Sequence, residues 1–308
     1  MSESYRLTTF GESHGPAIGG VIEGCPSGLK INRRLIADEL ARRATGKTSS
    51  ESQRRESDEV EFLSGLLDDV TLGTPIAFLV RNTNARSEDY VALKNTFRPS
   101  HADYTYQVKY GIRDWRGGGR GSARTMLPYV VAGAIAKQIL QQRGMAIRAE
   151  VQSIGGETDP SKIEALLLKC RKEGDSVGGI AHGSITGLPA GLGEPLDNKF
   201  QACLAKAMFT IPAVKGFEYG DGFALATMKG SEANDPMACN DDGSVKFLSN
   251  HSGGIQGGIT NGEEVRFNVA FKPIPTIGRG DRHDVCALPR AVVIVEAMAA
   301  LTVMRFMS

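Results

Sequence analysis

Two histidines occur in surroundings that would leave an imidazole open to a ligand. His14 lies in the stretch Phe10-Gly-Glu-Ser-His-Gly, and His101 follows Arg98-Pro-Ser. Histidine is the side chain best suited to give or take a proton near neutral pH, and small neighbours leave its ring accessible. The alternative for each is a structural histidine in a tight turn, because His182 and His251 also lie close to glycines. The sequence thus offers two candidate general acids.

A second chemical feature is a concentration of arginine between Arg98 and Arg124, where glycine is frequent and acidic residues are few. Five arginines fall in this stretch, and its only acidic residues are Asp103 and Asp114. Guanidinium groups suit phosphates and carboxylates, and so do the free amides of a helix that we expect to begin near Ser122. A solvent-exposed run of charge is the alternative. The stretch predicts a local anion site.

Near the C-terminus, Asp284 directly follows Arg282 and His283. A carboxylate in such a group could orient a proton donor or act as a base. It could equally cap the helix that follows, since aspartate often precedes helices. Asp284 is therefore a third candidate, with two interpretations.

The residues from Ala41 to Thr48 fall one residue short of the phosphate-binding loop G-x-x-x-x-G-K-[ST], because Ala41 replaces the leading glycine. Such a loop follows a strand and opens a helix, whereas this stretch follows a helical run. We therefore do not expect binding of a nucleoside triphosphate here.

Five segments show helical periodicity, and short β-like runs lie between them. The predicted helices cover residues 31–43, 122–144, 159–174, 196–209 and 290–307, and the β-like runs include 19–24, 75–80, 146–154 and 263–271. Asp159 is the expected N-cap before Pro160, and Gly174 follows the end of that helix. Pro128 would cost about 3 kcal/mol or more inside the second helix, so we expect that helix to start late or bend.

The composition is that of a turn-rich globular protein. The 308 residues include 36 basic and 35 acidic side chains, so no overall charge would attract nucleic acid or an anionic membrane. No apolar run approaches the roughly 20 residues of a membrane helix, and the N-terminus lacks a secretory pattern. The five cysteines form no C-x-x-C pair, and we expect them to be reduced and mostly buried. We expect a single domain over residues 1–308, in the cytoplasm, without a metal site.

Long segments of the chain, taken in order, resemble the chorismate synthase family. The resemblance spans nearly the whole chain and includes FGESHGPAIGGVIEGCPSG, ESDEVEFLSG, GTPIAFLVRNT, FRPSHADYTYQVKYGIRDWRGGGRGSAR, IPAVKGFEYGDGF, NHSGGIQGGITNG and GDRHDVC. It implies an α/β (α+β) fold in which central helices are sandwiched between antiparallel sheets, assembled as a homotetramer. It also implies the shikimate-pathway lyase reaction, an anti-1,4-elimination of phosphate from 5-enolpyruvylshikimate 3-phosphate that uses reduced FMN without net oxidation.

The resemblance also implies roles for the candidate acids and bases. His14 would protonate the departing phosphate. His101 would protonate or neutralise the anionic reduced flavin near its N1 and C2 carbonyl. Ser13 and Asp284 match the relay to flavin N5, through which the substrate's ring proton is removed.

Binding roles are implied in the same way. Arg43, Arg98 and Arg124 match the cations that hold the phosphate and carboxylates of the substrate. The implied FMN contacts are Arg120, Gly121, Ser122, Pro212, Ala213, Gly257, Lys272, Pro273, Ile274, Pro275, Thr276 and Arg282.

The chain departs from the family pattern at several positions. Ser49 replaces an arginine that would contact the substrate or NADPH, the reductant that the resemblance allows, and Thr125 replaces an acidic residue. The sequence between Ile277 and Asp281 is short where the family has an extended loop. A flavin-binding member with impaired catalysis is the alternative that these departures leave open.

Overall fold

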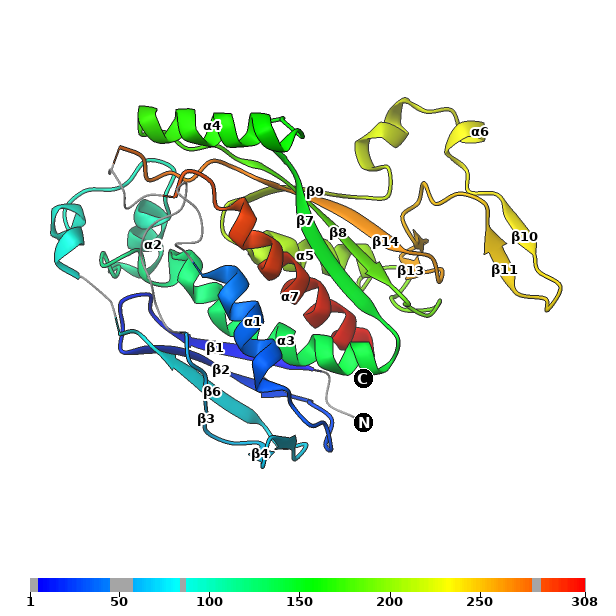
Figure 1. Cartoon of the computed structure of the whole chain (residues 1–308), viewed down its shortest axis with the longest axis horizontal. Coiled ribbons are helices and arrows are strands. Elements are labelled where there is room, and N and C mark those ends of the chain that lie inside the picture. Colours follow the sequence, from blue (N-terminus) through cyan, green and yellow to red (C-terminus); the bar gives the residue numbers. More distant parts are fainter. Residues whose placement is uncertain (1–4, 45–57, 84–86, 279–283, 308) are drawn as a thin grey trace.

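A layer of helices lies between two antiparallel sheets in the computed structural model, which describes residues 5–44, 58–83, 87–278 and 284–307 (Figure 1). The first sheet has the order β1-β2-β6-β3 and the second the order β7-β8-β14-β9. Every pairing within both sheets is antiparallel. This arrangement confirms the predicted fold class.

The first sheet consists of β1 (Arg6–Gly11), β2 (Ala17–Glu23), β3 (Glu61–Phe62) and β6 (Ile76–Arg81). The second consists of β7 (Ala146–Ile154), β8 (Gly179–Thr186), β9 (Val214–Tyr219) and β14 (Val265–Phe271). Three small hairpins are formed by β4 (Leu66–Leu67) with β5 (Val70–Thr71), β10 (Met237–Cys239) with β11 (Val245–Phe247), and β12 (Ile255–Gln256) with β13 (Ile259–Thr260). The alternating burial along β14 matches a strand with one face on the core.

The α-helices are α1 (Arg33–Arg43), α2 (Asp103–Tyr110), α3 (Leu127–Gln142), α4 (Pro160–Glu173), α5 (Phe200–Thr210), α6 (Gly230–Ala233) and α7 (Leu288–Phe306). Four 3₁₀ segments complete the described structure, namely η1 (Ser87–Leu93), η2 (Gly119–Gly121), η3 (Ala123–Met126) and η4 (Gly222–Thr227). All five helices expected from periodicity are present, although the predicted segment 196–209 becomes helical only from Phe200.

Helix α4 has the predicted ends. The Asp159 side chain accepts hydrogen bonds from the amides of Ser161 and Lys162, and Gly174 adopts a left-handed φ of 66° at the C-cap. The expected effect of Pro128 is also confirmed, because α3 begins only at Leu127, after η3. Pro128 then lies in the first turn of α3, where its missing amide hydrogen costs nothing.

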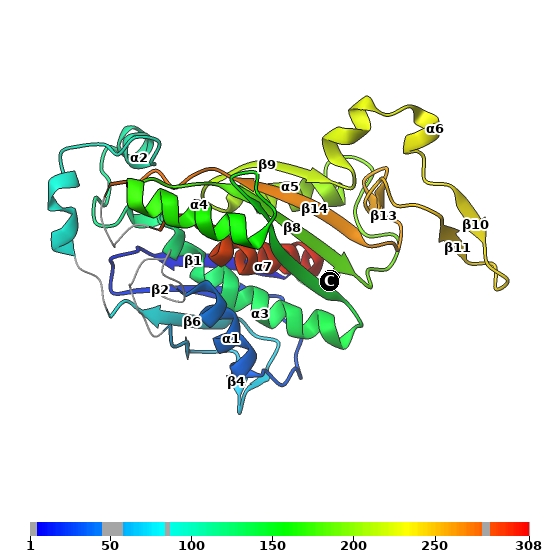
Figure 2. The same cartoon turned by 45° about the horizontal axis from the view of Figure 1, so that its top comes forward.

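Helices α3 and α7 cross at the centre of the molecule, and both views show them side by side between the sheets (Figures 1 and 2). A Cβ on Gly133 of α3 would lie only 2.4 Å from Cβ of Ala297 on α7. The absence of a side chain at Gly133 therefore sets how closely the two helices approach.

A buried carboxylate ties the helices to the second sheet. Glu296 on α7, with a side chain 5% exposed, accepts hydrogen bonds from Arg42 of α1 at 2.7 and 2.8 Å, from Lys137 of α3, and from the amide of Ala149 in β7. Burial alone would raise the pKa of Glu296, but the bonds from Arg42 and the charge of Lys137 hold it below its ordinary value.

The segment from η4 to β11 extends away from the body of the molecule in both views (Figures 1 and 2). Its base is held where Asp221 pairs with His251 at 2.5 Å and with Arg266 at 2.6 Å. Several of its apolar side chains are solvent-exposed, Phe223 among them at 80%.

Two further expectations are tested by the described residues. Their five cysteines form no disulfide, and Cys25, Cys170 and Cys286 are buried. The described part of the chain contains no helix that is both long and apolar enough to span a membrane.

We predict that Glu296→Gln will lower the free energy of unfolding by about 1–3 kcal/mol, because the charge-assisted bonds from Arg42 and Lys137 to a buried carboxylate are lost while Glu39 still pairs with both cations. Glu23→Gln, which breaks an exposed pair with Arg6, is the control and should cost about 1 kcal/mol or less. Denaturant unfolding at neutral pH measures both.

The pH dependence gives an independent check. The pKa of Glu296 in the folded chain lies below its ordinary value of 4.5. The contribution of its carboxylate to the free energy of unfolding is therefore fully present above that pH and is lost as the pH falls. The difference in free energy of unfolding between the parent chain and Glu296→Gln should therefore become smaller at acidic pH. A constant difference would contradict this account.

Candidate active site

Two successive glycines each lie against one of the candidate histidines. A Cβ on Gly117 would lie 2.1 Å from Cε1 of His14, and a Cβ on Gly118 would lie 2.8 Å from Cε1 of His101. Both glycines have left-handed φ angles, of 60° and 85°. The loop therefore lies against both rings at a distance that only glycine permits, and residues 87 positions apart in the chain face one short stretch of backbone.

His14 is held on more than one side. It is 7% exposed, its Nδ1 lies 3.1 Å from the Ser13 hydroxyl, and its ring packs edge-on against Tyr90 with centroids 5.0 Å apart. The Ser13 hydroxyl also lies 3.4 Å from the carbonyl of Arg116. If that hydroxyl donates to the carbonyl, its oxygen can accept from Nδ1 of His14.

Asn82 connects the His14 turn to a predicted substrate arginine. Its side-chain amide donates to the carbonyls of Glu12 at 3.1 Å and Gly15 at 2.8 Å. Its Oδ1 accepts from Nε of Arg124 at 2.7 Å. One amide directly after β6 thus fixes both the turn around His14 and the direction of the Arg124 side chain.

Arg43 and Arg124 share the carboxylate of Asp58. Nη2 of Arg43 lies 2.6 Å from Oδ2, and Nη1 of Arg124 lies 3.1 Å from Oδ1. All three side chains are less than 10% exposed. Two buried guanidinium groups are thus held side by side, and such groups suit a phosphate or carboxylate.

The surroundings of His101 are also strongly charged. Arg98 forms a bidentate pair with Asp103, with Nε to Oδ2 at 2.7 Å and Nη2 to Oδ1 at 2.9 Å. Nδ1 of His101 lies 3.1 Å from both Nη2 of Arg98 and Oδ1 of Asp103. Arg113 approaches the same carboxylate at 3.5 Å, and Lys272 donates to the carbonyl of Ser100 at 2.8 Å.

These charges set the protonation of His101. Burial, assisted by Arg98 and Lys272, lowers the pKa of the imidazole, and Asp103 opposes that shift. Burial would raise the pKa of Asp103, but the hydrogen bonds from Arg98 lower it to about 2. Near neutral pH the carboxylate is therefore ionised and the imidazole is neutral in the absence of a bound anion. A ligand with negative charge would favour its protonation.

Most of the described residues predicted to contact FMN lie next to the charged groups around His101 or at one end of β14. The amide of Lys272 donates to the carbonyl of Ala213 at 2.9 Å, and a Cβ on Gly121 would lie 3.2 Å from Cβ of Ala102. Arg120 donates to Thr9 at 2.7 Å and to the carbonyl of Gly11 at 3.0 Å. Ser122 directly precedes η3 and caps it, Pro212 precedes Ala213, and Pro273, Ile274, Pro275 and Thr276 follow Lys272.

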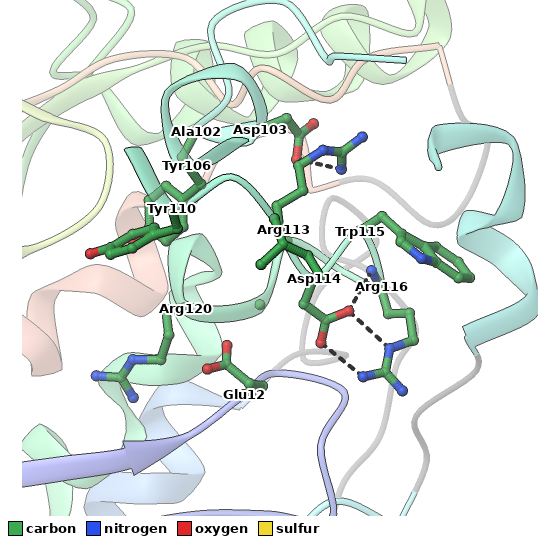
Figure 3. Close-up of a pocket in the computed structure, with 13 residues that line it drawn as sticks. Glu12, Ala102, Asp103, Tyr106, Tyr110, Arg113, Asp114, Trp115, Arg116 and Arg120 are labelled. Atoms are coloured by element: carbon green, nitrogen blue, oxygen red, sulfur yellow. Dashed lines mark hydrogen bonds and ion pairs between the residues drawn. The ribbon is translucent and has the colours of Figure 1, made fainter. Parts of the chain in front are cut away.

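A cavity of about 860 Å³ opens beside the glycine loop (Figure 3). Its wall includes Gly118, Glu12, Arg120 and Tyr110, and the paired side chains of Asp114 and Arg116, whose Oδ1 and Nε are 2.9 Å apart. Burial raises the pKa of Glu12, although Arg120 opposes this shift. The volume is within the range of cofactor sites.

Other sequence predictions have different outcomes. Asp284 precedes α7 and hydrogen-bonds Arg290, and its place in the site stays a prediction. Ser49 and Arg282 lie outside the described residues. Gly257 connects β12 and β13 at the Val265 end of β14, whereas Lys272 follows the opposite end, about 20 Å away along the strand. Within one copy of the chain Gly257 therefore lies away from Lys272, and its contact with FMN stays a prediction.

The described residues contain no group of three or more histidine, cysteine or acidic side chains placed to hold a metal ion. The residues from Ala41 to Arg43 form the last turn of α1, so the start of the stretch that resembles a phosphate-binding loop is helical.

Three site residues were not predicted as such from the sequence, namely Asp58, Asn82 and Asp103. Each lies within a segment that carries the family resemblance, and Asp103 is one of only two acidic residues in the arginine-rich stretch. That scarcity of acid was the available signal for Asp103. Nothing in the local sequence indicated that Asp58 and Asn82 would meet Arg124.

Comparison with known proteins gives consistent matches. The family model described as chorismate synthase matches residues 5–307. Proteins named chorismate synthase from Porphyromonas gingivalis and Parabacteroides distasonis are 50% and 47% identical, over 98% of this chain and 93% and 96% of theirs. A solved structure titled "Crystal Structure of Chorismate Synthase" has a TM-score of 0.80 at 30% identity, covering 99% of this chain and 92% of that one. The alignment to the Porphyromonas protein spans 343 positions, so that relative has segments that the 308-residue chain lacks.

We predict that Gly117→Ala will displace the His14 ring, since the added methyl group has no room beside Cε1. Gly28→Ala is the matched control, because Gly28 has a similar φ of 84° with no atom within 4 Å of the added Cβ. Both variants should carry the backbone cost of about 1–2 kcal/mol, but only Gly117→Ala should shift the ring resonances of His14 in NMR spectra. Unchanged His14 resonances would contradict the contact.

Proposed function

The chain belongs to the chorismate synthase family, and from this membership we infer that it converts 5-enolpyruvylshikimate 3-phosphate to chorismate and inorganic phosphate. Chorismate synthase is a carbon–oxygen lyase of the shikimate pathway, which leads to the aromatic amino acids. The observation that carries the inference is the family match over residues 5–307. The contact of His14 and His101 with one glycine loop, and the burial of Arg43 and Arg124, support it.

The reaction is a 1,4-elimination with no net oxidation. The C–O bond to phosphate breaks and its electron pair leaves with the phosphate, while a ring C–H bond breaks and its electrons complete the new diene. The protein must therefore neutralise a departing phosphate, accept a ring proton and hold a ligand with several negative charges.

We assign the proton for the departing phosphate to His14. Ser13 contacts the ring at Nδ1 and Tyr90 packs against it edge-on. We assign the transfer to Nε2 of the protonated ring. A buried general acid in a fixed orientation contributes roughly 10²- to 10⁴-fold to such a step.

Arg43, Arg98 and Arg124 would bind the phosphate and carboxylates of the substrate. Arg43 is 7% exposed, and its Nε has no hydrogen-bond acceptor among the described residues. A buried donor without an acceptor is unfavourable unless a ligand satisfies it. In the protein without substrate, Asp58 holds Arg43 and Arg124 in place, so these cations are positioned before the substrate binds.

The family's chemistry depends on a flavin, and we propose reduced FMN as the form that this chain uses. The residues present suit it, because Lys272 and Arg120 supply positive charge near the glycine-rich turn, where backbone approach is close. When bound, reduced FMN would lend electron density to the substrate and recover it. Pro273 and Pro275 would stiffen the segment that follows Lys272. NADPH is the reductant that we propose.

His101, Ser13 and Asp284 complete the proposed machinery. His101 would hold a proton beside the flavin's negative charge. That charge would raise the pKa of the imidazole, which burial and Arg98 lower in the free protein. We propose that Ser13 and Asp284 carry away the ring proton of the substrate. A carboxylate is a suitable final acceptor near neutral pH.

We also propose a homotetramer in the cytoplasm, with residues 1–308 as one domain. The extended segment exposes Phe223 and Met237, and exposed apolar groups of this kind mark protein contacts. A second copy would also be needed to bring Gly257 to an FMN site. Sedimentation of the purified chain tests this assembly, and a monomer at micromolar concentration would exclude it.

The proposed function is tested by anaerobic turnover of 5-enolpyruvylshikimate 3-phosphate with photoreduced FMN. We expect chorismate fluorescence and phosphate to appear together in equal amounts. Oxidised FMN without a reductant is the control and should give neither. Tight flavin binding without either product would favour the catalytically impaired alternative.

We predict that His101→Ala will lower kcat by roughly 100-fold or more while changing FMN affinity only a few-fold, because the lost group transfers a proton. His182→Gln, at a histidine of β8 bonded to Asn268, is the control and should retain turnover. Flavin titration and anaerobic kinetics measure the two effects. Equal losses of affinity and turnover would indicate a structural role for His101.

A further inference from the structure

We propose that Asn82 is a positioning residue that sets the proton donor and a substrate cation in one fixed relation. Its side chain holds the turn that carries His14, and it also aims the guanidinium of Arg124. The catalytic part of this inference rests on the proposed function. Its structural part concerns the chain without any ligand.

The turn that carries His14 is closed by a single backbone hydrogen bond. The amide of Gly15 donates to the carbonyl of Glu12 at 3.0 Å, which leaves Ser13 and His14 as the two corner residues. Both corner residues belong to the proposed proton-transfer machinery. The direction in which they point therefore depends on how firmly the two ends of this turn are held.

Asn82 holds both ends of the turn. The two hydrogens on its Nδ2 allow it to donate to the carbonyl of Glu12, at 3.1 Å, and to the carbonyl of Gly15, at 2.8 Å. The backbone amide of Asn82 also donates to the carbonyl of Pro16 at 3.1 Å. A residue that directly follows β6 is thus bonded to the beginning, the end and the continuation of the His14 turn.

The oxygen of the same amide is used by Arg124. Oδ1 of Asn82 accepts a hydrogen bond from Nε of Arg124 at 2.7 Å, which is short because the donor is ionised. Polarity fixes the direction of this amide, since an arginine can only donate and backbone carbonyls can only accept. A flipped amide would place its hydrogens against a guanidinium and its oxygen against two carbonyls.

Burial makes these bonds difficult to replace with water. His14 is 7% exposed and Arg124 is 8% exposed. Nη1 of Arg124 also donates to Asp58 at 3.1 Å, so two acceptors on different segments orient the guanidinium. An anion bound to Arg124 and a proton held by His14 are therefore both placed with reference to Asn82, which itself would not touch the ligand.

The structural part is tested by hydrogen exchange of the Asn82 side-chain amide in the ligand-free chain, followed by ¹⁵N NMR with assigned resonances. Because both Nδ2 hydrogens are bonded to backbone carbonyls, we expect them to exchange roughly tenfold or more slowly than those of Asn198, which is exposed. Exchange as fast as that of Asn198 would overturn the proposal. This measurement depends neither on a variant that folds nor on enzyme activity.

The catalytic part is tested with Asn82→Ala, which removes every side-chain bond of this residue. We expect kcat to fall roughly tenfold or more, because the proton donor is released, and the KM of the proposed substrate to rise several-fold, because Arg124 loses an acceptor. Asn268→Ala is the matched control, since the amide of Asn268 also joins two groups, His182 and Glu218, in the second sheet. It should leave both constants unchanged.

A second variant separates the two ends of the amide. Asn82→Asp keeps the size of the side chain and an acceptor for Arg124, but it removes the two donors to the His14 turn. We expect kcat to fall in this variant as well. A folded Asn82→Asp protein with the kcat of the parent chain would contradict the role of these donors.

A double-mutant cycle distinguishes positioning from a general loss of stability. If Asn82 acts on the proton transfer through His14, Asn82→Ala should lower kcat much less in a His14→Ala background than in the parent chain. An equal loss in both backgrounds would overturn the proposal. Absence of chorismate formation by the parent chain, with slow exchange of the Asn82 amide, would instead refute the proposed function and leave the structural part intact.

Discussion

The close approach of two imidazoles to consecutive glycines is the constraint on which the rest of the site depends. His14 comes from the turn between β1 and β2, and His101 comes from the segment before α2. Any side chain at Gly117 or Gly118 would occupy the space of one of these rings. The glycine loop therefore lets both proposed proton-transfer groups approach one short stretch of backbone, and the surrounding contacts hold them there.

Those contacts use buried polar groups that act through other residues. Asn82 joins the His14 turn to Arg124, Asp58 joins Arg124 to Arg43, and Asp103 joins Arg98 to His101. Each cationic group is therefore oriented before a ligand enters, which reduces the reorganisation that binding requires. Glu296 serves the fold in a comparable way, since one buried carboxylate fixes α1, α3 and α7 against β7.

Local signals in the sequence predicted the features that local physics determines. The caps of α4, the late start of α3 at Pro128, and the candidate role of His14 and His101 follow from residue types within a few positions of each other. Asp58 and Asn82 could not be predicted in this way, because their meaning depends on meeting Arg124 from 66 and 42 positions away. The FMN contact of Gly257 rests on the resemblance alone, and it stays a prediction.

The spacing of the two imidazoles is tested most directly by nuclear Overhauser effects in a deuterated chain with protonated histidine and glycine. The account predicts cross-peaks from Hε1 of His14 to an α-proton of Gly117, and from Hε1 of His101 to an α-proton of Gly118, in the same sample. Absence of both cross-peaks in the folded protein, with each resonance assigned, would contradict the account.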